Sequence, residues 1–197
     1  MSLLNNINKL KEHLKSLHIS HEEEILKLNT LKDANIYCVI NNITSQQYGP
    51  LLEKFIQSKF NFIKNKASSD IGDCCKGDKN YEIKVSLGGQ THKKFNFVQI
   101  RFYQDCDIYI FTAYHLSNEN VDNAGELYIF RIPKIELEKI IIQYGGYAHG
   151  TYKKQGPITF ETLQNKNNAI KEYSIRPNIN DNCWNNLLLF RILESEL

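Results

Sequence analysis

Long hydrophobic runs are missing from this sequence of 197 residues. No uninterrupted apolar run reaches about 18 residues, the length that a membrane-spanning helix needs. The first residues, 1–14, mix apolar residues with Asn and Lys and lack the continuous apolar core of a secretory signal. We therefore expect a cytoplasmic protein that has no membrane partner.

Cysteine is scarce and irregularly spaced. The five cysteines are Cys38, Cys74, Cys75, Cys106 and Cys183, and no two of them form a Cys-x-x-Cys pair. An odd number without regular spacing argues against a disulfide framework and indicates reduced thiols in a reducing compartment. A zinc site built from Cys74, Cys106 and a histidine remains an alternative use of these side chains.

Several signatures of nucleotide and ester chemistry are also absent. No stretch fits the phosphate-loop pattern Gly-x-x-x-x-Gly-Lys-Ser/Thr, and none fits the nucleophile elbow Gly-x-Ser-x-Gly. We therefore expect no nucleotide cofactor. The net charge of +2 neither requires nor excludes a nucleic acid, because local clustering of cations matters more than their sum.

The overall composition is that of a globular protein, with 42% hydrophobic and 23% charged residues. The chain shows no internal repeat, no low-complexity tract and no linker rich in Pro, Gly or Ser. We expect one domain over residues 1–197, of a size that can bury a core. It divides into a helical N-terminal region over 1–45, a core region over 46–155 and a closing segment over 156–197.

Helical patterns dominate the first third of the chain. Apolar spacing predicts an amphipathic helix over 3–17. Ser20 with Glu23 forms a capping box that starts a second helix over 21–32, whereas the apolar run over 35–43 fits a helix or a strand. Gly49 and Pro50 mark the start of a helix over 49–63, and Glu53 lies at the margin of its apolar stripe.

Strand patterns follow. The run "DIGDCC" over 70–75 fits a short strand, a turn follows it, and "YEIKVSL" over 81–87 alternates apolar and polar residues. Further strands are predicted over 95–103, 107–116 and 126–132, and the last two are apolar on both faces, as in covered central strands. A helix follows Pro133, and the last apolar run, "NCWNNLLLFRILE", fits a helix or a strand. This order predicts an α/β or α+β fold, a mixed sheet flanked by helices.

The hairpin carries the residue types of a metal-dependent phosphodiesterase. Strand alternation places Glu82 and Lys84 on one face, about 7 Å apart. Asp73 lies across the turn, where the partner strand can hold it beside Glu82, and Glu53 can lend a third carboxylate. Carboxylates bind hard divalent cations, and a nearby lysine stabilises developing negative charge. The alternative is an ordinary solvated strand face.

The run "GD…YEIKVS…FNFVQIR" resembles the catalytic region of the PD-(D/E)xK nucleases, and particularly the type II restriction endonucleases. In that family an acid on one strand and Glu-x-Lys on the next bind Mg²⁺ and cut DNA, positions that Asp73, Glu82 and Lys84 match. Glu53 matches a glutamate on the preceding helix. The resemblance covers about residues 45–155 and implies a restriction-endonuclease-like fold with its catalytic core over 46–155. The proline of the family motif is absent before Asp73, so Asp70 remains a rival for the first metal ligand.

Basic and polar residues near this core are candidates for DNA contacts. Some lie on or after the predicted strand over 95–103, some in the preceding loop, and some in the glycine-rich loop over 144–157. They are Gln99, Arg101, Lys93, Lys94, His149, Thr151, Lys153 and Lys154. Cations near DNA displace counterions, and mixed donors suit major-groove edges. Solvated loops and a structural polar pair are the alternatives.

The predicted function is that of a Mg²⁺-dependent, sequence-specific endonuclease that hydrolyses double-stranded DNA. Cutting both strands of a symmetric site favours a homodimer. Two alternatives are a repair or junction-resolving nuclease of the same superfamily and a DNA-binding module without activity. The sequence does not specify the recognition site, the cut position or the role of the N-terminal helices.

Overall fold

The structure is a computed structural model that describes residues 20–66, 70–88, 94–149, 152–165 and 171–197. The predicted helix over 3–17 lies outside these ranges. In chain order the helices and strands are α2 (His21–Lys27), α3 (Leu31–Ile40), α4 (Ser45–Lys59), β1 (Ile63–Lys64), β2 (Cys74–Lys76), β3 (Lys79–Gly88), β4 (Phe97–Ile100), β5 (Ile108–His115), a 3-10 turn (Val121–Asn123), β6 (Glu126–Pro133), α5 (Lys134–Tyr144), β7 (Gly146–Tyr147), α6 (Tyr152–Gln155), α7 (Phe160–Gln164), β8 (Tyr173–Ile175), α8 (Asn182–Leu188), β9 (Arg191–Ile192) and a last 3-10 turn (Glu194–Glu196).

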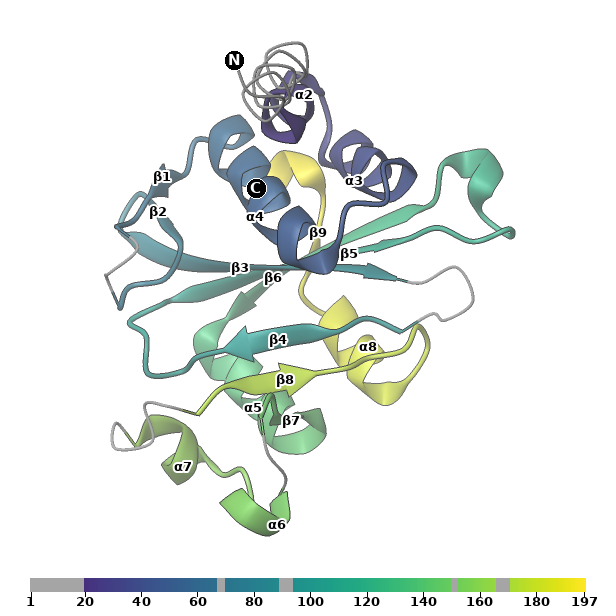
Figure 1. Cartoon of the computed structure of the whole chain (residues 1–197). Coiled ribbons are helices and arrows are strands. Elements are labelled where there is room, and N and C mark those ends of the chain that lie inside the picture. Colours follow the sequence, from purple (N-terminus) through teal and green to yellow (C-terminus); the bar gives the residue numbers. More distant parts are fainter. Residues whose placement is uncertain (1–19, 67–69, 89–93, 150–151, 166–170) are drawn as a thin grey trace, which may run out of the picture.

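Two sheets form the framework. The larger one has six strands in the order β1-β2-β3-β5-β6-β9, and the smaller has the order β4-β8-β7. Strands β3 and β5 run parallel, whereas the other neighbouring pairs are antiparallel. The large sheet is therefore mixed, and helices flank it, as the sequence predicted (Figure 1).

Each face of the large sheet has its own hydrophobic core. On one face lie α2, α3 and α4, and on the other lie the small sheet, α5 and α8 (Figure 1). Alternation along β5 divides its side chains: Ile110 packs with the N-terminal helices, whereas Tyr109 and Phe111 pack with the small sheet. Seven of the eight β5 residues are buried, which confirms the prediction of a covered central strand.

The N-terminal helices follow their capping residues closely. The predicted capping box is present, because Ser20 and Glu23 bond each other's backbone N–H groups at the start of α2. The predicted helix over 21–32 is wrong in length, since Leu28 is extended and Thr30 caps a new helix, α3. Helix α3 ends at Ile40, so most of the apolar run over 35–43 is helical.

Helix α4 begins earlier than its sequence indicates. The predicted start at Gly49 and Pro50 is wrong, because Thr44 is the N-cap and Pro50 lies inside the helix. The backbone N–H groups of Gln47 and Tyr48 already donate to the Thr44 carbonyl, at 2.9 Å each. Pro50 therefore lies beyond the first turn, where a proline has no N–H to donate to the carbonyl four residues earlier and interrupts the hydrogen-bond ladder of the helix at that point. The helix ends at Lys59, four residues before the predicted end at 63.

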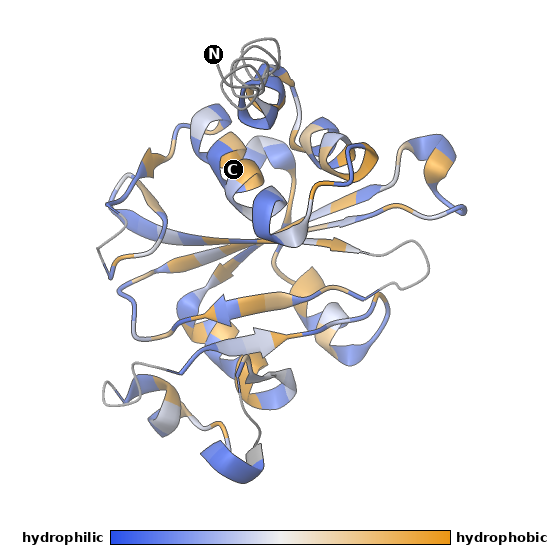
Figure 2. Cartoon of the chain, in the orientation of Figure 1, coloured by the Kyte–Doolittle hydropathy of each residue, from blue (hydrophilic) through white to orange (hydrophobic). Residues whose placement is uncertain are grey.

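The remaining elements place the aromatic residues in the second core. Trp184 of α8 is 1% exposed and stacks on Phe95 at 5.1 Å between ring centroids. Strand β4 is largely hydrophobic, whereas α6 is hydrophilic (Figure 2). All five cysteines are free thiols, as their spacing indicated. Among the helices that the structure describes, none has the length and apolar character needed to cross a membrane.

Candidate active site

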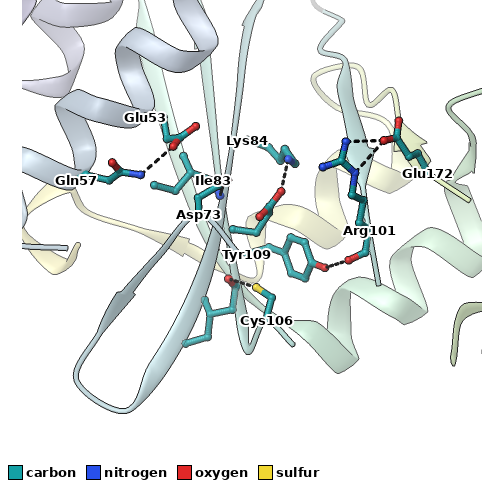
Figure 3. Close-up of polar contacts among 11 residues, drawn as sticks. Glu53, Gln57, Asp73, Ile83, Lys84, Arg101, Cys106, Tyr109 and Glu172 are labelled. Atoms are coloured by element: carbon teal, nitrogen blue, oxygen red, sulfur yellow. Dashed lines mark hydrogen bonds and ion pairs between the residues drawn. The ribbon is translucent and has the colours of Figure 1, made fainter. Parts of the chain in front are cut away.

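Three elements bring the four predicted catalytic residues to one pocket. Glu53 comes from α4, Asp73 directly precedes β2, and Glu82 and Lys84 come from β3 (Figure 3). The pocket has a volume of about 340 Å³. Its opposite wall is β4 with Arg101, so it opens between α4 and the small sheet.

Asp73 is fixed by the strand beside it. Its backbone N–H donates to the Tyr81 carbonyl at 2.9 Å, and its Oδ2 accepts from the backbone N–H of Ile83 at 2.8 Å. The side chain thereby continues the β2–β3 pairing beyond the end of β2. Asp70, the rival first acid, is exposed and does not line the pocket. The geometry therefore favours Asp73.

Glu82 is a buried acid with one unpaired oxygen. Its side chain is 2% exposed, Oε1 accepts from the Lys84 ammonium, and Oε2 has no hydrogen-bond partner in the part of the chain that the structure describes. Burial raises the pKa of Glu82, the Lys84 ammonium opposes this, and the Asp73 carboxylate adds to it. A buried carboxylate oxygen without a hydrogen-bond donor is costly, and a bound cation is one way to compensate it.

Glu53 faces the same pocket from the helix. The Gln57 amide, one turn further along α4, donates to Glu53 Oε1 at 2.9 Å. Burial raises the pKa of Glu53 to about 7, and the negative charge of Asp73 adds to the effect. Glu53, at the margin of the apolar stripe of α4, thus lines the same pocket as the hairpin residues.

The charge balance of the pocket suits a divalent cation. Three acids line it, and the cations among its lining residues are Lys84 and Arg101, of which Arg101 is already paired with Glu172. Mg²⁺ keeps several waters and needs only one or two protein carboxylates, so Asp73 and Glu82 with the unpaired Oε2 fit it. In the described ranges no three His, Cys, Asp or Glu side chains are grouped to hold a metal. Neither the alternative zinc site with Cys74 and Cys106 nor a site that uses Glu53, Asp73 and Glu82 together is such a group, so a Mg²⁺ ion here would be held by two carboxylates and water.

Strand β4 supplies the second wall. Gln99 and Arg101 both line the pocket, as expected for two residues on one strand face. Gln99 has a φ of +56° at an irregularity in the β4–β8 pairing, a conformation that non-glycine residues adopt rarely and often at functional sites. The Arg101 guanidinium donates to Glu172, a residue that no sequence pattern singled out.

The other predicted DNA contacts lie away from the pocket. Lys94 lines a neighbouring cavity of about 360 Å³ and is exposed. His149 is 84% exposed, with its Nε2 3.5 Å from Glu172 Oε2, and Lys153 and Lys154 are exposed on α6. Lys93 and Thr151 lie outside the described residues. The structure thus gathers the acids, Lys84, Gln99 and Arg101, but not the whole predicted DNA-binding set.

Two further cavities adjoin the pocket. The one that contains Lys94 shares Val98 and Gln99 with it. The other, of about 240 Å³, shares Glu53, Asp73 and Arg101 with it and adds Lys64. Because neighbouring cavities share lining residues, we refer to the three together as the groove.

Comparison with known proteins adds no family to this geometry. No protein-family model matches the chain, and no curated protein matches it either. Any assignment of function therefore rests on the arrangement of the pocket itself.

Proposed function

We propose that this protein is a Mg²⁺-dependent endonuclease that hydrolyses phosphodiester bonds in double-stranded DNA, of the type II restriction endonuclease kind. One observation carries the proposal: Glu53, Asp73, Glu82 and Lys84, which come from a helix, a loop and a strand, line one pocket. A solvated strand face, the alternative role for Glu82 and Lys84, does not fit an acid that is 2% exposed.

The residues divide the chemistry between them. Asp73 and Glu82 would hold the ion. A divalent cation bound there would polarise the phosphate and lower the pKa of a bound water. Lys84, 15% exposed and paired with Glu82, directs its ammonium into the pocket, where it stabilises negative charge on the phosphate or orients the attacking water. Glu53 adds a third carboxyl group on the α4 side.

The groove provides the place for the DNA backbone. Arg101 and Lys94 lie at different points of its wall and would contact phosphates. Recognition of a symmetric site is expected to use a homodimer, since a two-fold axis presents one pocket to each strand. Sedimentation of the protein with and without a DNA duplex measures this state.

Incubation with bacteriophage DNA and Mg²⁺, followed by sequencing of the fragment ends, tests the function. Discrete fragments with common end sequences are the expected result, and EDTA should abolish them. Lys84→Ala serves as the inactive control. If the cut positions depend on DNA structure and not on sequence, the protein would instead be a repair or junction-resolving nuclease. DNA binding without cleavage, unchanged by Glu82→Ala and Lys84→Ala, would indicate a binding module.

A further inference from the structure

Arg101 is held by an acid from the far end of the chain. Its Nε and one Nη donate to the same oxygen, Glu172 Oε1, at 2.8 and 2.6 Å. The Arg101 side chain is 32% exposed and that of Glu172 is 16% exposed. Charge-assisted bonds of this geometry restrict a long, flexible side chain to one orientation.

The small sheet fixes the two residues opposite each other. Ile100 pairs with Tyr173 in the antiparallel β4–β8 ladder, so Arg101, which follows Ile100, and Glu172, which precedes Tyr173, meet across the strands. The Glu172 carbonyl also accepts from the backbone N–H of Ala148 at 2.8 Å. The acid is therefore anchored through its backbone as well as through its side chain.

The ion pair leaves part of the guanidinium directed at the pocket. Two of its nitrogens are bonded to Glu172, and the third points toward the side on which Lys84 lies (Figure 3). Arg101 lines both the pocket with the acids and the adjoining cavity with Lys64. A guanidinium in this place presents N–H donors of fixed direction to an anion between β3 and β4.

We propose that Glu172 is a positioning residue: it orients Arg101 so that the remaining N–H groups of the guanidinium bind a non-bridging oxygen of the phosphate that is cleaved. This inference rests on the proposed nuclease function and adds to it a second cation, opposite Lys84, and the residue that aims it. Lys84 and Arg101 would then contact the phosphate from the two walls of the pocket.

A competing role for Glu172 predicts the opposite effect on cleavage. If Glu172 merely competed with phosphate for Arg101, its removal would free the arginine, and both DNA binding and cleavage would improve. Under the positioning role, Glu172→Ala still removes a negative charge beside the groove, so DNA binding stays equal or becomes tighter. Cleavage nevertheless slows, because an untethered guanidinium is misplaced at the moment of reaction.

The experiment measures single-turnover cleavage rate, DNA affinity and thermal unfolding of the full-length protein. The variants are Glu172→Ala, Glu172→Gln, Arg101→Ala and, as a matched control, Glu161→Ala, which removes an exposed acid of the same C-terminal region from α7. The expected result for Glu172→Ala is a rate lower by up to about a hundredfold at unchanged or tighter affinity. Glu172→Gln keeps an acceptor oxygen and should recover much of the rate.

The outcomes distinguish a failure of the positioning role from a failure of the proposed nuclease function. If the unaltered protein cuts no DNA with Mg²⁺, the proposed function itself fails. If the unaltered protein cuts and Glu172→Ala cuts as fast or faster, only the positioning role is overturned. A rate loss that Glu172→Gln does not recover, accompanied by a lower unfolding temperature, would assign Glu172 a purely structural role and would overturn it as well.

Discussion

The carboxylate of Asp73 accepts a hydrogen bond from the backbone N–H of Ile83, 2.8 Å away. Ile83 lies between Glu82 and Lys84 in β3, so this one bond ties the first acid of the pocket to the strand that carries the other two groups. Asp73 also lines the pocket. The same side chain therefore has a role in the fold and, under the proposed function, a role in the chemistry, and substitution can separate the two.

Asp73→Asn should remove activity while preserving the fold. The amide oxygen still accepts from the Ile83 N–H, but the negative charge is lost, so we expect cleavage to fall by at least about a hundredfold. Asp73→Ala also removes the acceptor and leaves a buried N–H unpaired, which costs about 1–3 kcal/mol of unfolding free energy. Urea unfolding and cleavage assays on both variants measure the two effects. Full activity of Asp73→Asn would remove Asp73 from the set of metal ligands.

Mg²⁺ should stabilise the folded protein through Glu82. A ligand that binds only the folded state at ten times its dissociation constant adds about 1.4 kcal/mol. We expect the unfolding temperature of the unaltered protein to rise with Mg²⁺ concentration, and that of Glu82→Gln to stay constant. The glutamine keeps an acceptor for Lys84 and removes only the charge. This measurement needs no DNA, and an equal rise in both proteins would place the ion elsewhere.

Local patterns predicted much of the fold. Alternation located β3, aromatic and β-branched runs located β5 and β6, and Ser20 with Glu23 located the start of α2. The parallel pairing of β3 with β5 and the separate small sheet were not predictable from such patterns, because they depend on connections between distant segments. The start of α4 was misplaced because Pro50 favours a first turn but does not require one.

Local patterns likewise predicted the part of the candidate site that lies on the hairpin, but not the part that depends on distant segments. The proximity of Glu82 and Lys84 follows from strand geometry, and that of Asp73 follows from a short turn. Glu172 carries no such signal, since it lies 71 residues from Arg101 and meets it only because β4 pairs with β8. Local sequence patterns cannot predict residues that reach the site only through pairing of distant strands.

The two glycines that flank β2 allow a test of how tightly the Asp73 loop is built. Both Gly72 and Gly77 have a positive φ, of +84° and +64°. An added Cβ at Gly72 would lie 2.6 Å from the Tyr81 carbonyl oxygen, whereas at Gly77 no atom lies within 4 Å. Gly77→Ala should therefore cost about 1 kcal/mol from backbone strain alone. Gly72→Ala should cost roughly 1–3 kcal/mol more.

Activity distinguishes the same two variants. Because Gly72 adjoins Asp73, a shift of this loop moves the carboxylate, and we expect Gly72→Ala to lose cleavage activity at temperatures where it is still folded. Gly77→Ala lies at an exposed turn and should cleave normally. Equal stability and activity of both variants would mean that the loop tolerates displacement and does not hold Asp73 in place.

Glu138 of α5 should make stability depend on pH. It is 4% exposed, and burial raises its pKa, an effect that Lys134 partly opposes. Ionisation is thus harder in the folded state than in the unfolded chain, where the pKa is about 4.3. Below that value both states are protonated and no penalty exists, and the penalty develops as the pH rises through the folded-state pKa.

Glu138→Gln removes this penalty, so the variant should unfold at a higher temperature than the unaltered protein at pH 7–8. The difference should shrink to zero as the pH falls toward about 4. Glu161→Gln, at an exposed position of α7, controls for the loss of one negative charge. Thermal unfolding of the three proteins across this pH range makes the comparison. A difference between Glu138→Gln and the unaltered protein that is constant with pH would arise from packing and not from ionisation of a buried acid.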